Sequence, residues 1–144
     1  MKNRILLVIA TLLFACTTTH HEGLEGTWKL VEYESIVDGK ATWTIPGNAE
    51  GEQLKSWSGE HFMFVGEFIS NGTTSANYGN GTYTLNGNHY TEHITIHVSE
   101  DYVGADERLL IEFKGDTLIQ INPVNVDWSY DKNNYRMEKY VRVK

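Results

Sequence analysis

Residues 81–96 read GTYTLNGNHYTEHITI, and this stretch decides the fold class. Its Asn-Gly pair at 86–87 favours a two-residue hairpin turn, because both turn positions need a positive φ. That turn places Tyr83 opposite Tyr90, and the side chains of both arms then alternate between two faces. One face carries Tyr83, Leu85, Tyr90, Glu92, Ile94 and Ile96. The other carries Thr82, Thr84, His89, Thr91, His93, Thr95 and His97. This sorting predicts that the first face points into a protein interior and the second into solvent.

The same alternation recurs along the chain after residue 23, whereas no segment keeps apolar residues at helical spacing over three turns. Turn-forming pairs such as Asp38-Gly39 and Ser58-Gly59 separate the runs. The predicted strands are 26–34, 40–45, 53–57, 62–69, 81–85, 89–98, 108–113, 117–122 and 135–143. The least ordered segments are expected at 47–52, 71–80 and 123–134. The pattern predicts an all-β fold, an antiparallel up-and-down barrel of about eight to nine strands.

A second hairpin, residues 109–122, turns at Gly115-Asp116. A two-residue loop there pairs Phe113 with Leu118 and Ile111 with Gln120. Its inward face is expected to carry Leu109, Ile111, Phe113, Leu118 and Gln120. The opposite face is also apolar, because it carries Leu110, Ile119 and Ile121.

Composition and spacing exclude several classes of function. The chain has 19 acidic and 12 basic residues in 144, a net charge of −7, so a nucleic-acid partner is not expected. A single cysteine excludes an internal disulfide framework and a multi-cysteine zinc module. His89, His93 and His97 stand four residues apart on an extended strand, which separates neighbours by about 13 Å, too far to share a metal ion. They are expected to be solvated, and no metal site is predicted. No catalytic motif is found in the sequence, so neither an enzyme activity nor a cofactor is predicted.

Glu92 is the charged member of the inward face. A buried carboxylate must be hydrogen-bonded, hydrated or protonated, because an unpaired buried charge is costly. Two interpretations stay open: the hydroxyls of Tyr83 and Tyr90 satisfy it as a structural group, or it anchors a ligand inside a cavity.

The N-terminus is typical of an export signal. A basic start is followed by the apolar run 5–15, which is too short to span a membrane and is interpreted as a signal peptide over residues 1–15. Residues 13–16, LFAC, resemble the lipobox of bacterial lipoproteins, whose cysteine is lipidated. The resemblance implies a lipid anchor on Cys16, a tether over 16–23 and a folded domain over 24–144. It also implies a location in the bacterial cell envelope, anchored to the outer membrane on its periplasmic or surface face. An ordinary secretory signal cleaved near Ala15 is the alternative.

Four segments in order resemble the lipocalin-like lipoproteins of unknown function found in gut bacteria. They are 24–30 (LEGTWKL), 53–64 (QLKSWSGEHFMF), 81–94 (GTYTLNGNHYTEHI) and 139–143 (KYVRV). The resemblance implies an up-and-down barrel with an interior cavity open at one end. It also implies that Trp28 packs at the closed end beneath an arginine, for which Arg142 is the first candidate and Arg136 the second.

The inward residues then define a candidate ligand site with mostly apolar walls and a few polar points. The predicted ligand-binding residues are Lys55, Phe62, Phe64, Tyr83, Tyr90, Glu92, Leu118, Gln120 and Trp128. The expected ligand is one small apolar or amphipathic molecule, bound by a monomer. A filled barrel needs the same side chains merely as core, so a packed interior, with protein or glycan partners at the surface loops, is the alternative. A barrel enzyme that uses Glu92 is a third possibility.

Overall fold

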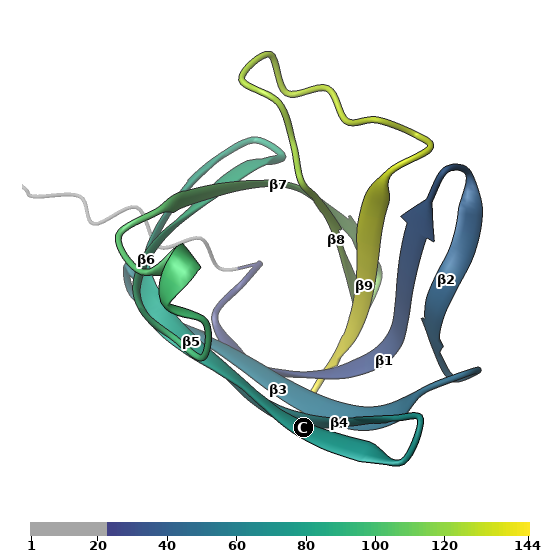
Figure 1. The fold of residues 1–144 in the computed structure, drawn as a ribbon. Coiled ribbons are helices and arrows are strands. Elements are labelled where there is room, and N and C mark those ends of the chain that lie inside the picture. The colour runs from purple at the N-terminus through teal and green to yellow at the C-terminus, as the bar shows by residue number, and fades with distance from the viewer. Residues whose placement is uncertain (1–22) are drawn as a thin grey trace, which may run out of the picture.

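The computed structural model describes residues 23–144 as an all-β protein (Figure 1). Its elements are β1 (Gly26–Val37), β2 (Lys40–Ile45), β3 (Glu50–Ser58), β4 (His61–Ser70), β5 (Thr73–Asn86), β6 (His89–His97), a short 3-10 helix η1 (Glu100–Tyr102), β7 (Asp106–Lys114), β8 (Thr117–Asn122) and β9 (Tyr135–Arg142). No helix within residues 23–144 is long and apolar enough to cross a membrane. The predicted signal peptide and Cys16 lie outside the described residues, as does the tether up to residue 22.

The strands close into an antiparallel barrel. Eight of them follow one another in the order β1-β3-β4-β5-β6-β7-β8-β9, and β9 pairs back onto β1. The ninth strand, β2, pairs with the later part of β1, after β3 has paired with its first residues. The eight strands form a closed ring, whereas among the described strands β2 pairs only with β1 and keeps its other edge unpaired. The predicted up-and-down barrel is confirmed, with β2 as an additional strand.

The two hairpins keep the predicted faces except at the end of β6. Between β7 and β8, Phe113 pairs with Leu118 and Ile111 with Gln120, as predicted. Between β5 and β6 the prediction was wrong by two residues, because Tyr83 pairs with Glu92 and the turn is Gly87-Asn88. Gly87 has φ 64°, which suits a turn with glycine at its first central position. A shift of two residues returns every side chain to the same face, so the inward assignment of Tyr83, Tyr90 and Glu92 holds.

One predicted loop is a strand. Residues 71–80 were expected to be irregular, but the turn is confined to Asn71-Gly72 and β5 begins at Thr73. The segment is polar, and a polar composition predicts a loop. In the structure it lies at the open rim of the barrel, where its pairing with β4 keeps the backbone extended. Similarly, β3 begins at Glu50, inside the predicted loop 47–52. The segment 123–134 holds no strand, as predicted.

A bulge changes the alternation near the end of β6. Asn80 pairs with Ile96 while Gly81 pairs with Ile94, so Thr95 is an extra residue on this strand. An extra residue reverses the in-and-out order beyond it. Ile96 is therefore 50% exposed, and His97 lines the interior. The predictions that Ile96 points inward and His97 points to solvent were both wrong for this reason.

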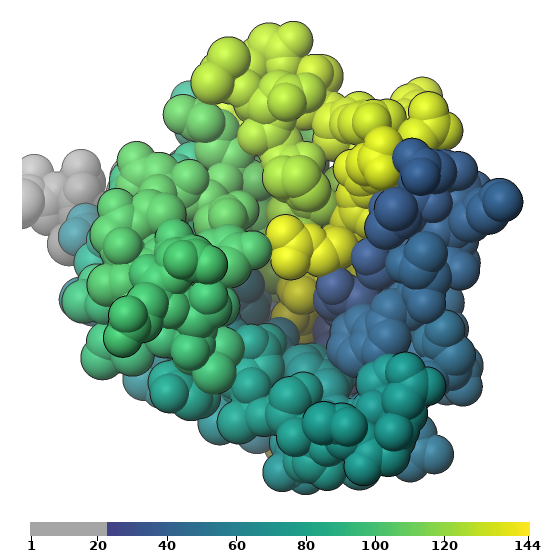
Figure 2. Space-filling view, viewed as in Figure 1, coloured from purple at the N-terminus to yellow at the C-terminus, as the bar shows by residue number. Residues whose placement is uncertain are grey.

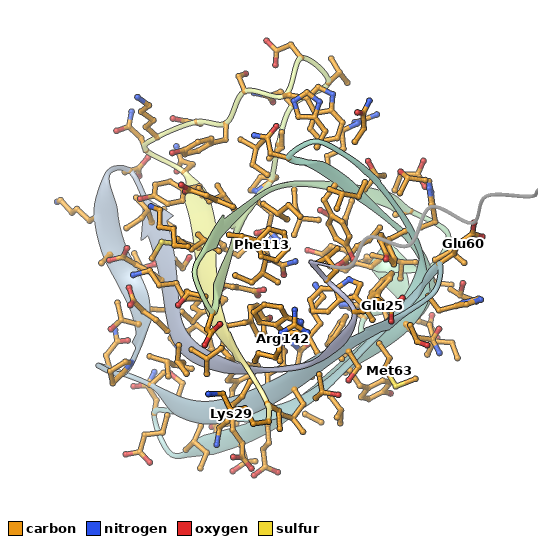
Figure 3. The ribbon with its side chains drawn as sticks, turned by 180° about the vertical axis from the view of Figure 1, so that it is seen from behind. Glu25, Lys29, Glu60, Met63, Phe113 and Arg142 are labelled. Atoms are coloured by element: carbon orange, nitrogen blue, oxygen red, sulfur yellow. The ribbon has the colours of Figure 1, made fainter. Side chains whose placement is uncertain are left out.

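The two ends of the barrel differ. One end is hollowed, and the hollow is visible between β9, β1 and the β4–β5 side in Figure 2. The opposite end is closed by Trp28, which is 1% exposed and whose indole N–H donates to the Leu24 carbonyl. The Arg142 guanidinium lies 4.3 Å from the centre of the Trp28 ring and donates to the backbone carbonyls of Gly23 and Glu25. Figure 3, seen from this end, shows Arg142 beside Phe113 and Glu25. This is the place that the resemblance implied for Trp28 and Arg142.

Candidate ligand cavity

The open half of the barrel contains a cavity of about 290 Å³. Its lining comes from every strand of the ring, from β2 and from η1. The lining residues are Tyr33, Trp43, Gln53, Lys55, Phe64, Phe68, Ser75, Ala76, Asn77, Glu92, Ile94, His97, Tyr102, Glu107, Leu109, Asn122, Arg136 and Glu138. Ten of these eighteen side chains are polar or charged. The cavity is therefore more polar than the sequence predicted.

The floor of the cavity is a buried ion pair. Lys55 on β3 and Glu92 on β6 are 4% and 5% exposed, and Nζ lies 2.6 Å from the Glu92 Oε1 atom. Lys55 Nζ also donates to Gln120 Oε1 at 3.1 Å. Lys55 is therefore the charged partner of the Glu92 carboxylate. One of the two interpretations left open by the sequence had given that role to the hydroxyls of Tyr83 and Tyr90. A buried pair of this kind is tolerated because each charge supplies what the other has lost in water.

Aromatic side chains surround the lysine. Its Nζ lies 5.3 to 6.0 Å from the ring centres of Trp57, Phe62, Phe64 and Tyr90, distances at which a cation is attracted by ring faces. The Trp57 indole N–H donates to the Tyr90 hydroxyl at 2.8 Å. Burial, followed by the nearby Glu92 charge, raises the pKa of Tyr90 well above its usual value, so this hydroxyl stays protonated. The Tyr90 hydroxyl also hydrogen-bonds to the Glu92 side chain.

A second polar chain crosses the wall formed by β5, β3 and β9. Asn77 donates to Gln53 Oε1 at 2.7 Å, Gln53 donates to the Tyr140 hydroxyl at 2.6 Å, and that hydroxyl donates to Glu138 Oε2 at 2.7 Å. Burial and then the Glu138 charge raise the pKa of Tyr140 well above its usual value. Each side chain in this series donates a hydrogen bond to the next one, so the series holds Asn77, Gln53 and Glu138 in fixed positions along the cavity.

The mouth has an aromatic side. The Trp43 ring on β2 lies edge-on to Tyr33 and Phe68, with ring centres 4.6 and 5.4 Å apart. His97 lies between Phe64 and Tyr102, with centre distances of 5.8 and 4.6 Å. The extra strand β2 therefore supplies Trp43 to the site, beyond its pairing with β1.

The mouth also has a charged side. Arg136 on β9 interacts with the hydroxyls of Tyr33 and Tyr102. Burial and the Glu138 charge raise the pKa of Tyr33 to about 12. Burial also raises the pKa of Glu107 on β7; the Arg136 charge opposes this shift and the neighbouring Glu92 adds to it.

Residues 23–144, which carry all nine strands and the whole cavity lining, match the model of a family described as Domain of unknown function (DUF4488). The chain belongs to this DUF4488 family. No curated protein matches the chain. The closed antiparallel barrel of this DUF4488 domain is consistent with a lipocalin-like fold.

The DUF4488 cavity brings together only part of the predicted site. Lys55, Phe64 and Glu92 line it. Five other predicted residues are buried in the core and do not line it; they are Phe62, Tyr83, Tyr90, Leu118 and Gln120. The placement of Trp128 in the cavity wall was wrong. Trp128 lies on the segment 123–134 with φ 64°, and its ring stacks on His89 with centres 4.1 Å apart. Alternation could not place it, because the segment has no regular strand.

Two groups among the cavity residues that sequence reasoning missed show what signal the sequence held. Arg136 and Glu138 have the same parity on β9 as Arg142, which had been placed inside, so the signal for them was present. Trp43 lies on a strand that was predicted, residues 40–45, but its place at the cavity mouth was not. His97 and Tyr102 depend on a bulge and a helical turn, and neither of these is visible as alternation. Within residues 23–144, no three His, Cys, Asp or Glu side chains are grouped closely enough to hold a metal ion. His93 instead pairs with Asp106 at 2.6 Å.

Proposed function

We propose that this DUF4488 barrel binds one small amphipathic molecule in its open cavity and that its role is non-catalytic. The observation that carries the proposal is the paired Lys55–Glu92 floor beneath a space of about 290 Å³ with aromatic walls. Ligand sites commonly combine apolar walls with a few oriented polar groups, in volumes of about 300–1,000 Å³. A cavity near the lower end of that range suits a small molecule.

The balance of the lining favours an amphipathic ligand over a purely apolar one. Trp43, Phe64 and Phe68 offer contacts for an apolar body. Gln53, Asn77 and the charged groups of the mouth offer hydrogen-bonding positions. A wholly apolar ligand would cover these groups without pairing them, and each unpaired polar group would weaken binding.

We further propose that Cys16 carries a lipid anchor in the bacterial envelope. Residues 16–22, if fully extended, span at most about 25 Å. They join the barrel at Gly23, whose carbonyl accepts a hydrogen bond from Arg142 at the closed end. The cavity mouth would then face away from the membrane. Cys16→Ser should move the protein from the membrane fraction to the soluble fraction, and retention in membranes would refute the anchor.

A second candidate function is favoured by the outer face of β3–β6. Leu54 pairs with Val65, which pairs with Tyr78, and the neighbouring Met63 and Ile96 also face outward. Their exposed fractions run from 42% to 62%. A contiguous exposed apolar patch is typical of a protein-binding surface. Sedimentation of Val65→Lys beside the wild type tests whether this face mediates association between copies of the protein. If the sedimentation coefficient depends on concentration in the same way for both proteins, this face does not mediate self-association.

The test of cavity binding compares two tryptophan substitutions on one strand. Ser75 pairs with Phe68 at the mouth and lines the cavity, whereas its neighbour Thr74 lies on the opposite face of β5. Titration with the fluorescent amphiphile N-phenyl-1-naphthylamine should give saturable one-to-one binding. Ser75→Trp should weaken it at least tenfold, while Thr74→Trp should leave it unchanged.

Native mass spectrometry of protein purified from its own host complements the titration, because it detects a retained natural ligand directly. A wild-type barrel that binds no probe and retains no small molecule would refute the proposal. So would equal effects of the two tryptophans, since binding would then lie outside the cavity.

A further inference from the structure

The charged side of the cavity mouth contains two hydrogen-bond acceptors without donors. The lining carboxylates are Glu92, Glu107 and Glu138; Lys55 pairs with the first and the Tyr140 hydroxyl donates to the last. Within residues 23–144, Glu107 is the one lining carboxylate with neither a hydrogen bond nor an ion pair. Asn122 Oδ1, also on the lining, is buried and accepts no hydrogen bond from any described residue. A buried acceptor without a donor, such as Asn122 Oδ1, is rare in folded proteins. The Glu107 carboxylate is half-buried and has the charge of Arg136 nearby.

The sheet register places these two acceptors beside each other. Leu110 pairs with Ile121, so the next pair along the β7–β8 ladder brings Asn122 opposite Leu109. Glu107 is two residues from Leu109 on the same face of β7, which makes it a diagonal neighbour of Asn122. Such neighbours lie about 7–8 Å apart, so one small group between them can reach both.

The charges of the lining favour a cation there. The charges of Lys55 and Glu92 cancel each other, which leaves the positive charge of Arg136 and the negative charges of Glu107 and Glu138. The remaining sum is −1 with His97 neutral. Glu107 also faces Glu92 directly across the β6–β7 ladder. Like charges in opposite positions repel, and a positive group near Glu107 relieves that repulsion.

The two cationic side chains of the lining, Arg136 and Lys55, already have partners, which argues against an anionic ligand. Arg136 interacts with the hydroxyls of Tyr33 and Tyr102. Lys55 gives its hydrogen bonds to Glu92 and Gln120 in the floor. An anion would have to compete with these partners. A cation instead meets Asn122 Oδ1, which has no donor, and the half-buried Glu107 carboxylate, and the rings of Tyr102, Phe64 and Trp43 offer it attractive faces.

We propose that the ligand of this cavity is a small organic amine, whose ammonium group donates to Glu107 and Asn122 while its apolar body lies against Trp43 and Phe68. An ammonium carries three donors and no acceptor, which matches two acceptors that lack donors. This inference rests on the proposed binding function and adds the chemical class of the ligand.

The test uses three probes of similar size and different charge: 2-phenylethylamine, 2-phenylethanol and 3-phenylpropionate. Calorimetric titration at pH 7 should show the amine binding at least tenfold more tightly than the alcohol, and the carboxylate more weakly than both. Glu107→Gln should abolish the preference for the amine and leave the affinity for the alcohol unchanged. Glu112→Gln is the matched control, because Glu112 lies on the outer face of the same strand beside Lys114 and should change nothing.

A second measurement does not depend on a variant. Binding of the amine should weaken as the pH falls through the pKa of Glu107, since protonation removes its charge, while binding of the alcohol should stay constant. Equal affinities for the three probes would overturn the amine and leave cavity binding intact. A preference for 3-phenylpropionate that Arg136→Gln removes would also overturn it, because the site would then be an anion site. If none of the probes binds, both proposals fail.

Discussion

The buried Lys55–Glu92 pair gives the sharpest test of how this barrel is built. In Lys55→Met the carboxylate of Glu92, 5% exposed, remains in the floor without its cation. Removing one partner of a buried pair typically destabilises a protein by about 3–5 kcal/mol. Replacing both partners is often close to neutral. The double variant Lys55→Met, Glu92→Leu should therefore recover most of the stability that the single variant loses.

The assay is urea unfolding at pH 7, followed by tryptophan fluorescence. With a denaturant slope of about 1.5 kcal/mol per molar, a loss of about 3 kcal/mol lowers the midpoint by about 2 M. The matched control is Lys29→Met, which removes an exposed pair with Glu52 on the outer surface, whose side chains are 51% and 77% exposed. An exposed pair contributes about 0–1 kcal/mol, so the control midpoint should move little. Equal midpoints for Lys55→Met and Lys29→Met would refute a dry, paired floor, since water would then be solvating Glu92.

Three further predictions follow from the closed end, the bulge and the rim. Arg142→Leu removes the cation over Trp28 and two hydrogen bonds to backbone carbonyls; we expect a loss of about 2 kcal/mol, seen as a melting temperature lower by roughly 8 °C. Deletion of Thr95 removes the bulge and turns His97 outward, so a folded variant should bind N-phenyl-1-naphthylamine more weakly, and unchanged affinity would contradict the role of the bulge. The pKa of Tyr33 is raised from 10.0 to about 12, so the contribution of this tyrosine to stability is complete below pH 10 and is lost as the pH rises toward 12. In a titration followed by absorbance at 295 nm, Tyr33→Phe should lack one of the tyrosines that ionise late in the wild type.

The alternation of side chains between the two faces of a strand, here called parity, explains how much of the fold could be predicted. In a closed barrel each inward residue fixes its neighbours along the strand, so Tyr83 and Glu92 could be placed even though the predicted hairpin register was two residues wrong. Parity is insensitive to even shifts and reverses at any odd insertion. His97 was misplaced for that reason, because the bulge at Thr95 lies between it and the rest of β6.

Depth along the barrel axis could not be predicted in the same way. Parity separates inside from outside, but it does not distinguish an inward residue of the closed core from one at the cavity wall. Tyr90 and Lys55 are both inward, yet only Lys55 lines the cavity. Depth depends on strand stagger, which ring closure sets through pairings such as that of Trp28 with Arg142. Those pairings join residues more than one hundred positions apart, and no local pattern in the sequence records them.

The charged floor of the cavity supports the proposed binding function more than it supports a purely structural role. An apolar pair of similar size can be as stabilising as a buried ion pair, and often more so, because it avoids the desolvation of two charges. A barrel under no demand except stability therefore gains nothing from Lys55 and Glu92 at this depth. Charges that are held by Gln120 and Tyr90, at the base of an open space, do give a bound molecule a fixed polar surface to meet. On the proposed function, the polar floor serves a molecule that enters from the mouth, whereas the closed end, with Trp28 beneath Arg142, is buried core.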